Sequence, residues 1–102
     1  MNVETNFKIP RVRSKKHMAF VATKPCLCCG WKRPEVHHLT CGPEPKARGL
    51  KAGDNWTVPL CSTCHRTLHA QGSERAFWSA RDIDPIAVAA QLWAQSEEAG
   101  RA

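Results

Sequence analysis

Two Cys-x-x-Cys pairs constrain the fold of this 102-residue chain more than any other feature. The four cysteines are Cys26, Cys29, Cys61 and Cys64. At this spacing two thiolates can point at one tetrahedral Zn²⁺, so the two pairs together predict a closed four-cysteine site. Gly30 follows the first pair directly, and its access to positive φ favours pairing through Cys29 over Cys28. Cys28 and Cys41 are then left outside the site.

The small size of the chain explains why such a site would be needed. A single domain of this length buries only about 60 to 68% of its unfolded surface, and structural zinc contributes on the order of 10 to 16 kcal/mol of apparent binding energy. No apolar run is long enough to span a membrane, and residues 1–10 lack the core of a signal peptide. We therefore expect a soluble cytoplasmic protein, in which clustered thiols bind metal more often than they form disulfides.

Basic residues gather near the beginning of the chain. The formal net charge is +6, and the first 24 residues hold six of the 15 Lys and Arg against one acid. Such a segment suits nucleic-acid phosphates, because each cation that neutralises a phosphate releases a counterion. The alternative is a solvated terminus that keeps the protein soluble. The residues expected to contact DNA, some of them in the Gly- and Pro-rich loop over 42–53, are Arg11, Arg13, Lys15, Lys16, Lys46, Arg48 and Lys51.

Turn and cap residues divide the chain into three parts. These are a basic arm over 1–24, a zinc-containing core over 25–72 and C-terminal helices over 73–102. Aromatic and β-branched residues predict a short strand over 56–60, with Pro59 at an edge or a strand end. A helix is expected over 62–71, ended by Gly72, and another begins after the N-cap Ser73. Asp84 and Pro85 predict the start of a last helix.

Two histidines lie between the cysteine pairs, and two more follow the second pair. His65 and His69 are four residues apart on the expected helix, so they can present two imidazoles to one metal. Cys64 and His65 are adjacent and therefore about 100° apart around that helix, which favours two separate ions. The alternative is that one histidine completes a Cys₃His zinc site. In the pair His37-His38, neighbouring side chains diverge, so one can bind an ion while the other takes a proton from water.

Taken together, these motifs resemble the HNH endonucleases, also called His-Me finger or ββα-metal nucleases. The pattern is Cys26-x-x-Cys29, His37-His38 and Val58-Pro59-Leu60-Cys61-x-x-Cys64-His65-x-x-x-His69. It is most similar to the small phage and prophage branch related to the recombination-associated nuclease Ref. The downstream segments 74–78 and 83–85 also fit that branch, and the resemblance extends over about 13–95.

The resemblance implies an α+β, zinc-stabilised ββα-metal fold with additional C-terminal helices. It implies that His38 is the general base and that His37, His65 and His69 hold a catalytic Mg²⁺ or Mn²⁺, which Zn²⁺ or Ni²⁺ could replace. The order within His37-His38 could also be reversed. The middle asparagine of the family falls at Trp56 here. Asn55, one place away, or Asp54 is therefore expected to brace the loop and orient the base.

The implied activity is hydrolysis of double- or single-stranded DNA with weak sequence specificity. A recombinase is an expected partner, and a bacterial host of a phage or prophage is the expected setting. Two other functions remain open at this stage. One is a non-catalytic zinc-dependent DNA-binding or adaptor module on the same scaffold, and the other is a four-cysteine protein-interaction finger.

Overall fold

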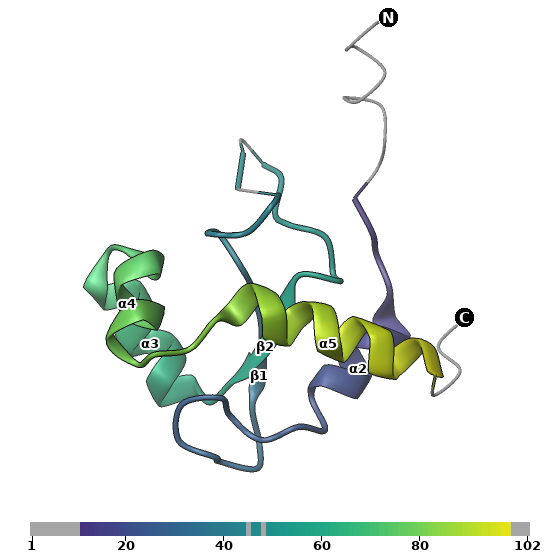
Figure 1. The fold of residues 1–102 in the computed structure, drawn as a ribbon, viewed down its shortest axis with the longest axis horizontal. Helices are drawn as coiled ribbons and strands as arrows, with labels where there is room; N and C mark the ends of the chain where they lie inside the picture. The colour runs from purple at the N-terminus through teal and green to yellow at the C-terminus, as the bar shows by residue number, and fades with distance from the viewer. Residues whose placement is uncertain (1–10, 45, 48, 99–102) are drawn as a thin grey trace, which may run out of the picture.

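Two strands and four helices form a small α+β fold in the part of the chain that the computed structural model describes, residues 11–44, 46–47 and 49–98 (Figure 1). The elements are α2 (Lys15–Val21), β1 (Glu35–His38), β2 (Thr57–Leu60), α3 (Ser62–Gln71), α4 (Glu74–Ala80) and α5 (Pro85–Glu98). Among these residues, no helix combines the length and the apolarity needed to cross a bilayer.

The two strands form an antiparallel sheet that lies in the middle of the molecule. His37 is opposite Val58 and His38 is opposite Thr57. All four residues of β2 are buried, because α2, α3 and α5 pack against this strand. Successive side chains of a strand point to opposite faces, so His37 and His38 face different surroundings. This alternation decides which partners each histidine meets.

The helices of the second half begin where their cap residues predict, and α3 also ends at its predicted glycine. Ser62–Gln71 is α3, and Gly72 ends it with a φ of 88°. The side chain of Ser73 accepts a hydrogen bond from the Ala76 amide at 3.2 Å and begins α4. Asp84 accepts one from the Ala87 amide at 3.2 Å at the start of α5. These caps set the positions of the residues that follow them.

The region predicted as a basic arm contributes a helix to the core. In α2, His17 and Val21 are buried four residues apart, and the helix packs against α5 and β2. His17 Nδ1 lies 2.8 Å from Ser96 Oγ in α5. The irregular apolar pattern over 18–22 is compatible with a short helix or a strand, since one of the two residues that the helix buries is a histidine. Within the region predicted as an arm, Lys15–Val21 is thus a packed helix, and residues 1–10 lie outside the described part.

Candidate metal centre

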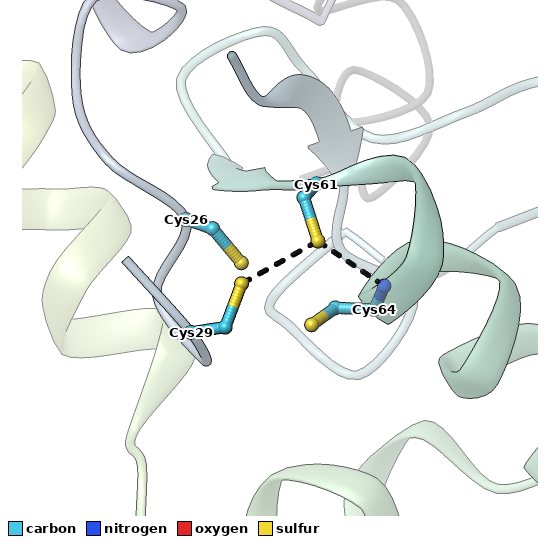
Figure 2. Close-up of side chains that lie close together, drawn as sticks. All are labelled: Cys26, Cys29, Cys61 and Cys64. Atoms are coloured by element: carbon cyan, nitrogen blue, oxygen red, sulfur yellow. Dashed lines mark hydrogen bonds between the residues drawn. The ribbon is translucent and has the colours of Figure 1, made fainter. Parts of the chain in front are cut away.

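Four cysteine sulfurs converge beside the end of β2 (Figure 2). The sulfurs of Cys26, Cys29, Cys61 and Cys64 all lie within 4.8 Å of one another. Cys29 Sγ and Cys61 Sγ are 3.6 Å apart. A tetrahedron with Zn–S bonds of about 2.3 Å needs sulfurs roughly 3.8 Å apart, so the cluster has the dimensions of a zinc site. The structure thus brings together the four predicted cysteines, with Cys28 and Cys41 outside the cluster.

Backbone hydrogen bonds hold the two cysteine turns in place. Gly30 has a φ of 79°, as predicted, and its amide donates to the Cys26 carbonyl at 2.9 Å. The Leu27 amide donates to the Pro59 carbonyl at 3.0 Å, which ties the first turn to β2. Cys61 is the N-cap of α3, and its sulfur accepts from the Cys64 amide at 3.4 Å. The second turn is therefore continuous with the helix that carries two of the histidines.

The ionisation of the cysteines also suits a cation. Burial raises the pKa of Cys26, but hydrogen bonds from backbone amides, that of Cys61 first, outweigh it and lower the pKa to about 6. Burial and the neighbouring thiols raise the pKa of Cys64. Such a cluster ionises one thiol readily and resists further negative charge. A divalent ion would supply the charge that the remaining thiolates need.

Three histidines form a second cluster between β1 and α3. The ring nitrogens of His37, His65 and His69 also lie within 4.8 Å of one another. His37 Nδ1 and His65 Nε2 face each other at 3.0 Å, and the ring centroids of His65 and His69 are 4.8 Å apart. His37 is buried, His65 half-buried and His69 exposed. The cluster therefore opens to solvent on the side of His69.

Two carboxylates that sequence reasoning did not include lie behind this cluster. Glu74 Oε2 is 3.0 Å from His37 Nε2, and Glu35 Oε1 is 2.7 Å from His65 Nδ1. Glu35 is two residues before His37, and the period of a strand could have indicated that both face α3. Glu74 is the first residue of α4, and only the fold brings it to β1. In both pairs the carboxylate contacts the nitrogen on the far side of the ring from the cluster.

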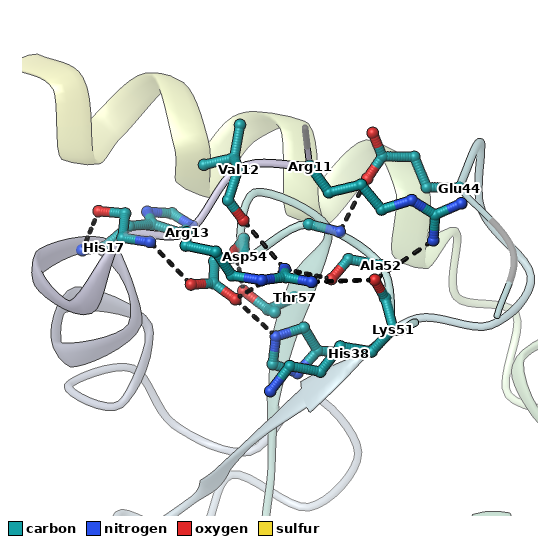
Figure 3. Close-up of polar contacts among 12 residues, drawn as sticks. Arg11, Val12, Arg13, His17, His38, Glu44, Lys51, Ala52, Asp54 and Thr57 are labelled. Carbon is teal, nitrogen blue, oxygen red and sulfur yellow. Dashed lines mark hydrogen bonds and ion pairs between the residues drawn. The ribbon is translucent and has the colours of Figure 1, made fainter. Parts of the chain in front are cut away.

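His38 follows His37 on β1, so its side chain projects to the other face of the strand. There it pairs with Asp54 (Figure 3). His38 Nε2 lies 2.8 Å from Asp54 Oδ1. Burial lowers the pKa of His38, and the hydrogen bond that His38 donates to Asp54 opposes this without reversing it. A lowered pKa favours the neutral imidazole, which is the state that a general base requires.

Asp54 is held from several sides, whereas Asn55 has no described contact with His38. The Ser14 amide donates to Asp54 Oδ2 at 2.7 Å, and Arg13 Nη1 lies 3.5 Å from Oδ1. Burial raises the pKa of Asp54, but the hydrogen bonds from His38 and Ser14 and the charge of Arg13 lower it below its ordinary value. Asn55 Oδ1 is buried without a hydrogen-bond partner. Of the two residues expected to orient the base, the structure places Asp54 in that position.

The basic residues expected to contact DNA divide into two groups. Arg11 and Arg13 donate to the carbonyl oxygens of Lys51 and Ala52, so they attach the start of the described chain to the long loop. Lys15, Lys16, Lys46 and Lys51 are exposed, and the Arg13 side chain, although hydrogen-bonded, is also 43% exposed. Arg48 lies outside the described residues. The two arginines therefore have a structural role in addition to any contact with phosphate.

The fold and the two clusters define a small α+β protein with two candidate metal sites. Residues 4–88 match the family of proteins of unknown function DUF968, and the chain belongs to this family. The chain is also 38% identical over 69 residues to the uncharacterized protein YdfU of Escherichia coli (strain K12), a match covering 65% of this chain and 20% of YdfU. It thus spans about a fifth of that relative. No solved structure matches the chain. Neither name describes an activity, so function has to be argued from the site.

Proposed function

We propose that this protein is a metal-dependent endonuclease that hydrolyses DNA phosphodiester bonds on an HNH-type ββα-metal scaffold, with a structural zinc in the cysteine cluster. One juxtaposition carries the proposal. His38, which pairs with Asp54, is adjacent in sequence to His37, a member of the three-histidine cluster. Both histidines lie on the first strand of a hairpin, and α3 follows the second strand directly. The motif order of the sequence supports the same assignment.

The donor set of the histidine cluster fits a divalent transition metal. Imidazole nitrogens suit Zn²⁺ and Ni²⁺, whereas Mg²⁺ prefers oxygen ligands. His37, His65 and His69 would hold the ion, and three protein ligands with an open side are typical of catalytic sites. A bound ion would act as a Lewis acid for the charge on the scissile phosphate and the departing 3′ oxygen. The donors thus favour Zn²⁺ or Ni²⁺ over the Mg²⁺ or Mn²⁺ that the resemblance implies.

His38 is the general base of the proposed reaction. Ionised Asp54 can only accept a hydrogen bond, so His38 Nε2 carries the proton and Nδ1 has the free lone pair. Nδ1 takes a proton from water while the water oxygen bonds to phosphorus and the bond to the 3′ oxygen breaks. The leaving oxygen takes a proton from solvent, which gives a 5′ phosphate and a 3′ hydroxyl.

The exposed lysines are suited to holding the DNA backbone. Lys15 and Lys16 lie on α2, and Lys46 and Lys51 on the long loop. Contacts of this kind position nucleic acid without reading its sequence, which agrees with weak specificity. A recombinase partner and a cytoplasmic phage or prophage setting stay predictions from the resemblance alone.

A plasmid-nicking assay tests this function. The zinc-containing protein should convert supercoiled DNA to nicked or linear forms when Ni²⁺, Zn²⁺, Mn²⁺ or Mg²⁺ is added, and EDTA should stop the reaction. His38→Ala should lower the rate about 10²- to 10⁴-fold, which is the usual contribution of a general base. Gln71→Ala, an exposed position at the end of α3, is the matched control and should cut normally. Unchanged cleavage by His38→Ala would exclude His38 as the base.

A non-catalytic DNA-binding module is the second candidate. The exposed lysines and the cysteine cluster favour it, since neither needs a hydrolytic site. This module would bind DNA with a strong dependence on salt but leave the plasmid intact with every ion. A protein-interaction finger would neither bind nor cut the plasmid.

A further inference from the structure

We propose that Glu74 is a positioning residue that fixes the ring and the tautomer of His37, so that Nδ1 is the atom presented to a divalent ion. The inference rests on the proposed function, because it concerns the same histidine cluster. Glu74 touches neither DNA nor the ion in this scheme and acts only through His37.

The first argument is the set of groups around the Glu74 carboxylate. Oε2 accepts from Trp78 Nε1 at 2.8 Å and lies 3.0 Å from His37 Nε2. Oε1 accepts from the amide of Thr40 at 2.9 Å and from its hydroxyl at 2.5 Å. The indole and amide donors cannot act as acceptors, so both oxygens must accept. Only a carboxylate provides acceptors at both ends of this side chain.

The second argument concerns the proton on His37. The Trp78 indole and the Thr40 amide donate to the two oxygens of Glu74, so the carboxylate acts as an acceptor, and His37 Nε2 carries the hydrogen that points at it. Nδ1 then has a free lone pair that faces His65 Nε2 at 3.0 Å. Hydrogen bonding at the far ring nitrogen is a common way in which proteins orient a histidine ligand.

The third argument is that Glu74 is held independently of His37. Thr40 follows β1 closely, and Trp78 is one turn further along α4, so the carboxylate is fixed from the sheet and from its own helix. Glu35 differs, because it makes one described bond to His65 and its side chain is 54% exposed, against 5% for Glu74. Loss of Glu74 should therefore matter more than loss of Glu35.

The test is calorimetric titration of Ni²⁺ into protein that already holds one zinc per chain. Glu74→Gln should weaken Ni²⁺ binding about 10- to 100-fold, the usual effect of losing such a partner, and Glu35→Gln should weaken it less. Gln71→Ala, at an exposed position at the end of α3, is the control and should leave Ni²⁺ binding unchanged. A folded Glu74→Gln with wild-type affinity would overturn the inference.

A second measurement covers the case in which Glu74→Gln does not fold. Nitrogen-15 NMR of the wild-type protein before Ni²⁺ is added should show His37 protonated at Nε2, and protonation at Nδ1 would overturn the inference. The outcomes also separate it from the nuclease function. Glu74-dependent Ni²⁺ binding without cleavage contradicts only the nuclease, and cleavage with Glu74-independent binding contradicts only the role of Glu74.

Discussion

The cysteine and histidine clusters share α3 but are built differently. Cys61 and Cys64 lie at its first turn, and His65 and His69 follow on the same ten-residue helix. The cysteine cluster has four ligand atoms and is held by backbone hydrogen bonds. The histidine cluster has three, with an exposed member on one side and carboxylates behind the other two. A closed set of four is typical of structural sites, and an open set of three is typical of catalytic ones.

The difference shows how one short helix can serve two purposes. Residues of one helical turn point in different directions, so neighbouring side chains contribute to separate clusters. The cysteine cluster connects segments far apart in sequence and thereby stabilises the hairpin. The histidine cluster depends on that hairpin for its geometry, since His37 lies on β1. Damage to the cysteines should therefore affect both clusters, whereas damage to the histidines should affect one.

The largest expected effect is the loss of the fold when the cysteine cluster is broken. Cys61→Ser, or removal of zinc with a strong chelator, should unfold the protein, because structural zinc contributes on the order of 10 to 16 kcal/mol. Circular dichroism and the zinc content per chain measure this. Cys41→Ser is the control, since Cys41 lies outside the cluster. If the Cys61→Ser variant binds no zinc and still melts at the temperature of the wild type, the cluster does not have the structural role given to it here.

A smaller effect is expected when His69, the exposed member of the histidine cluster, is removed. Loss of a residue that only supports a ligand weakens metal affinity about 10- to 100-fold. His69 is proposed to be a ligand itself, so His69→Ala should weaken binding of the second ion by at least this factor. The melting temperature and the bound zinc should stay close to wild type, because His69 is exposed. Unfolding of His69→Ala would show that the two clusters are not separable.

Asp54 offers a comparison between the His38 site and an ordinary cap. Asp54→Asn keeps one acceptor oxygen but places an amide N–H against one of the two donors, Ser14 N or His38 Nε2, so it should lower the free energy of unfolding by about 1 to 3 kcal/mol. Asp84→Asn is the matched control, because asparagine caps a helix about as well as aspartate. Urea unfolding measures both. Equal effects of the two substitutions would mean that Asp54 is only another cap.

The smallest expected effect tests the end of the shared helix. Gly72→Ala should cost about 1 to 2 kcal/mol, because its φ of 88° is unfavourable for a residue with a Cβ. Nothing lies within 4 Å of that Cβ, so only the backbone conformation matters. Gly42→Ala, at an ordinary φ, should cost less. Zinc content should not change, since Gly72 is remote in sequence from the first turn of α3. Loss of zinc from Gly72→Ala would contradict this separation.

Local patterns predicted much of the fold. The bounds of α3, its glycine stop, the cap of α4 and the start of α5 follow from a few adjacent residues, and the structure confirms them. The irregular apolar pattern over 18–22 left a short helix and a strand equally open, and the structure shows a helix, Lys15–Val21, whose buried face includes His17. Buried His17 contacts Ser96, which is far along the chain, and no local sequence pattern predicts that contact.

The sequence by itself determined which side chains could become ligands, since the Cys-x-x-Cys and His-x-x-x-His spacings place pairs of donors on one turn or one helical face. Only the tertiary structure decided which carboxylates contact the histidines. Glu74 meets His37 across 37 residues, and Asp54 rather than Asn55 meets His38 across 16. The spacing of residues in the sequence does not predict such contacts, because the packing of the whole core decides how two distant segments approach each other. The chemistry of each histidine therefore depends on partners that only the folded chain supplies.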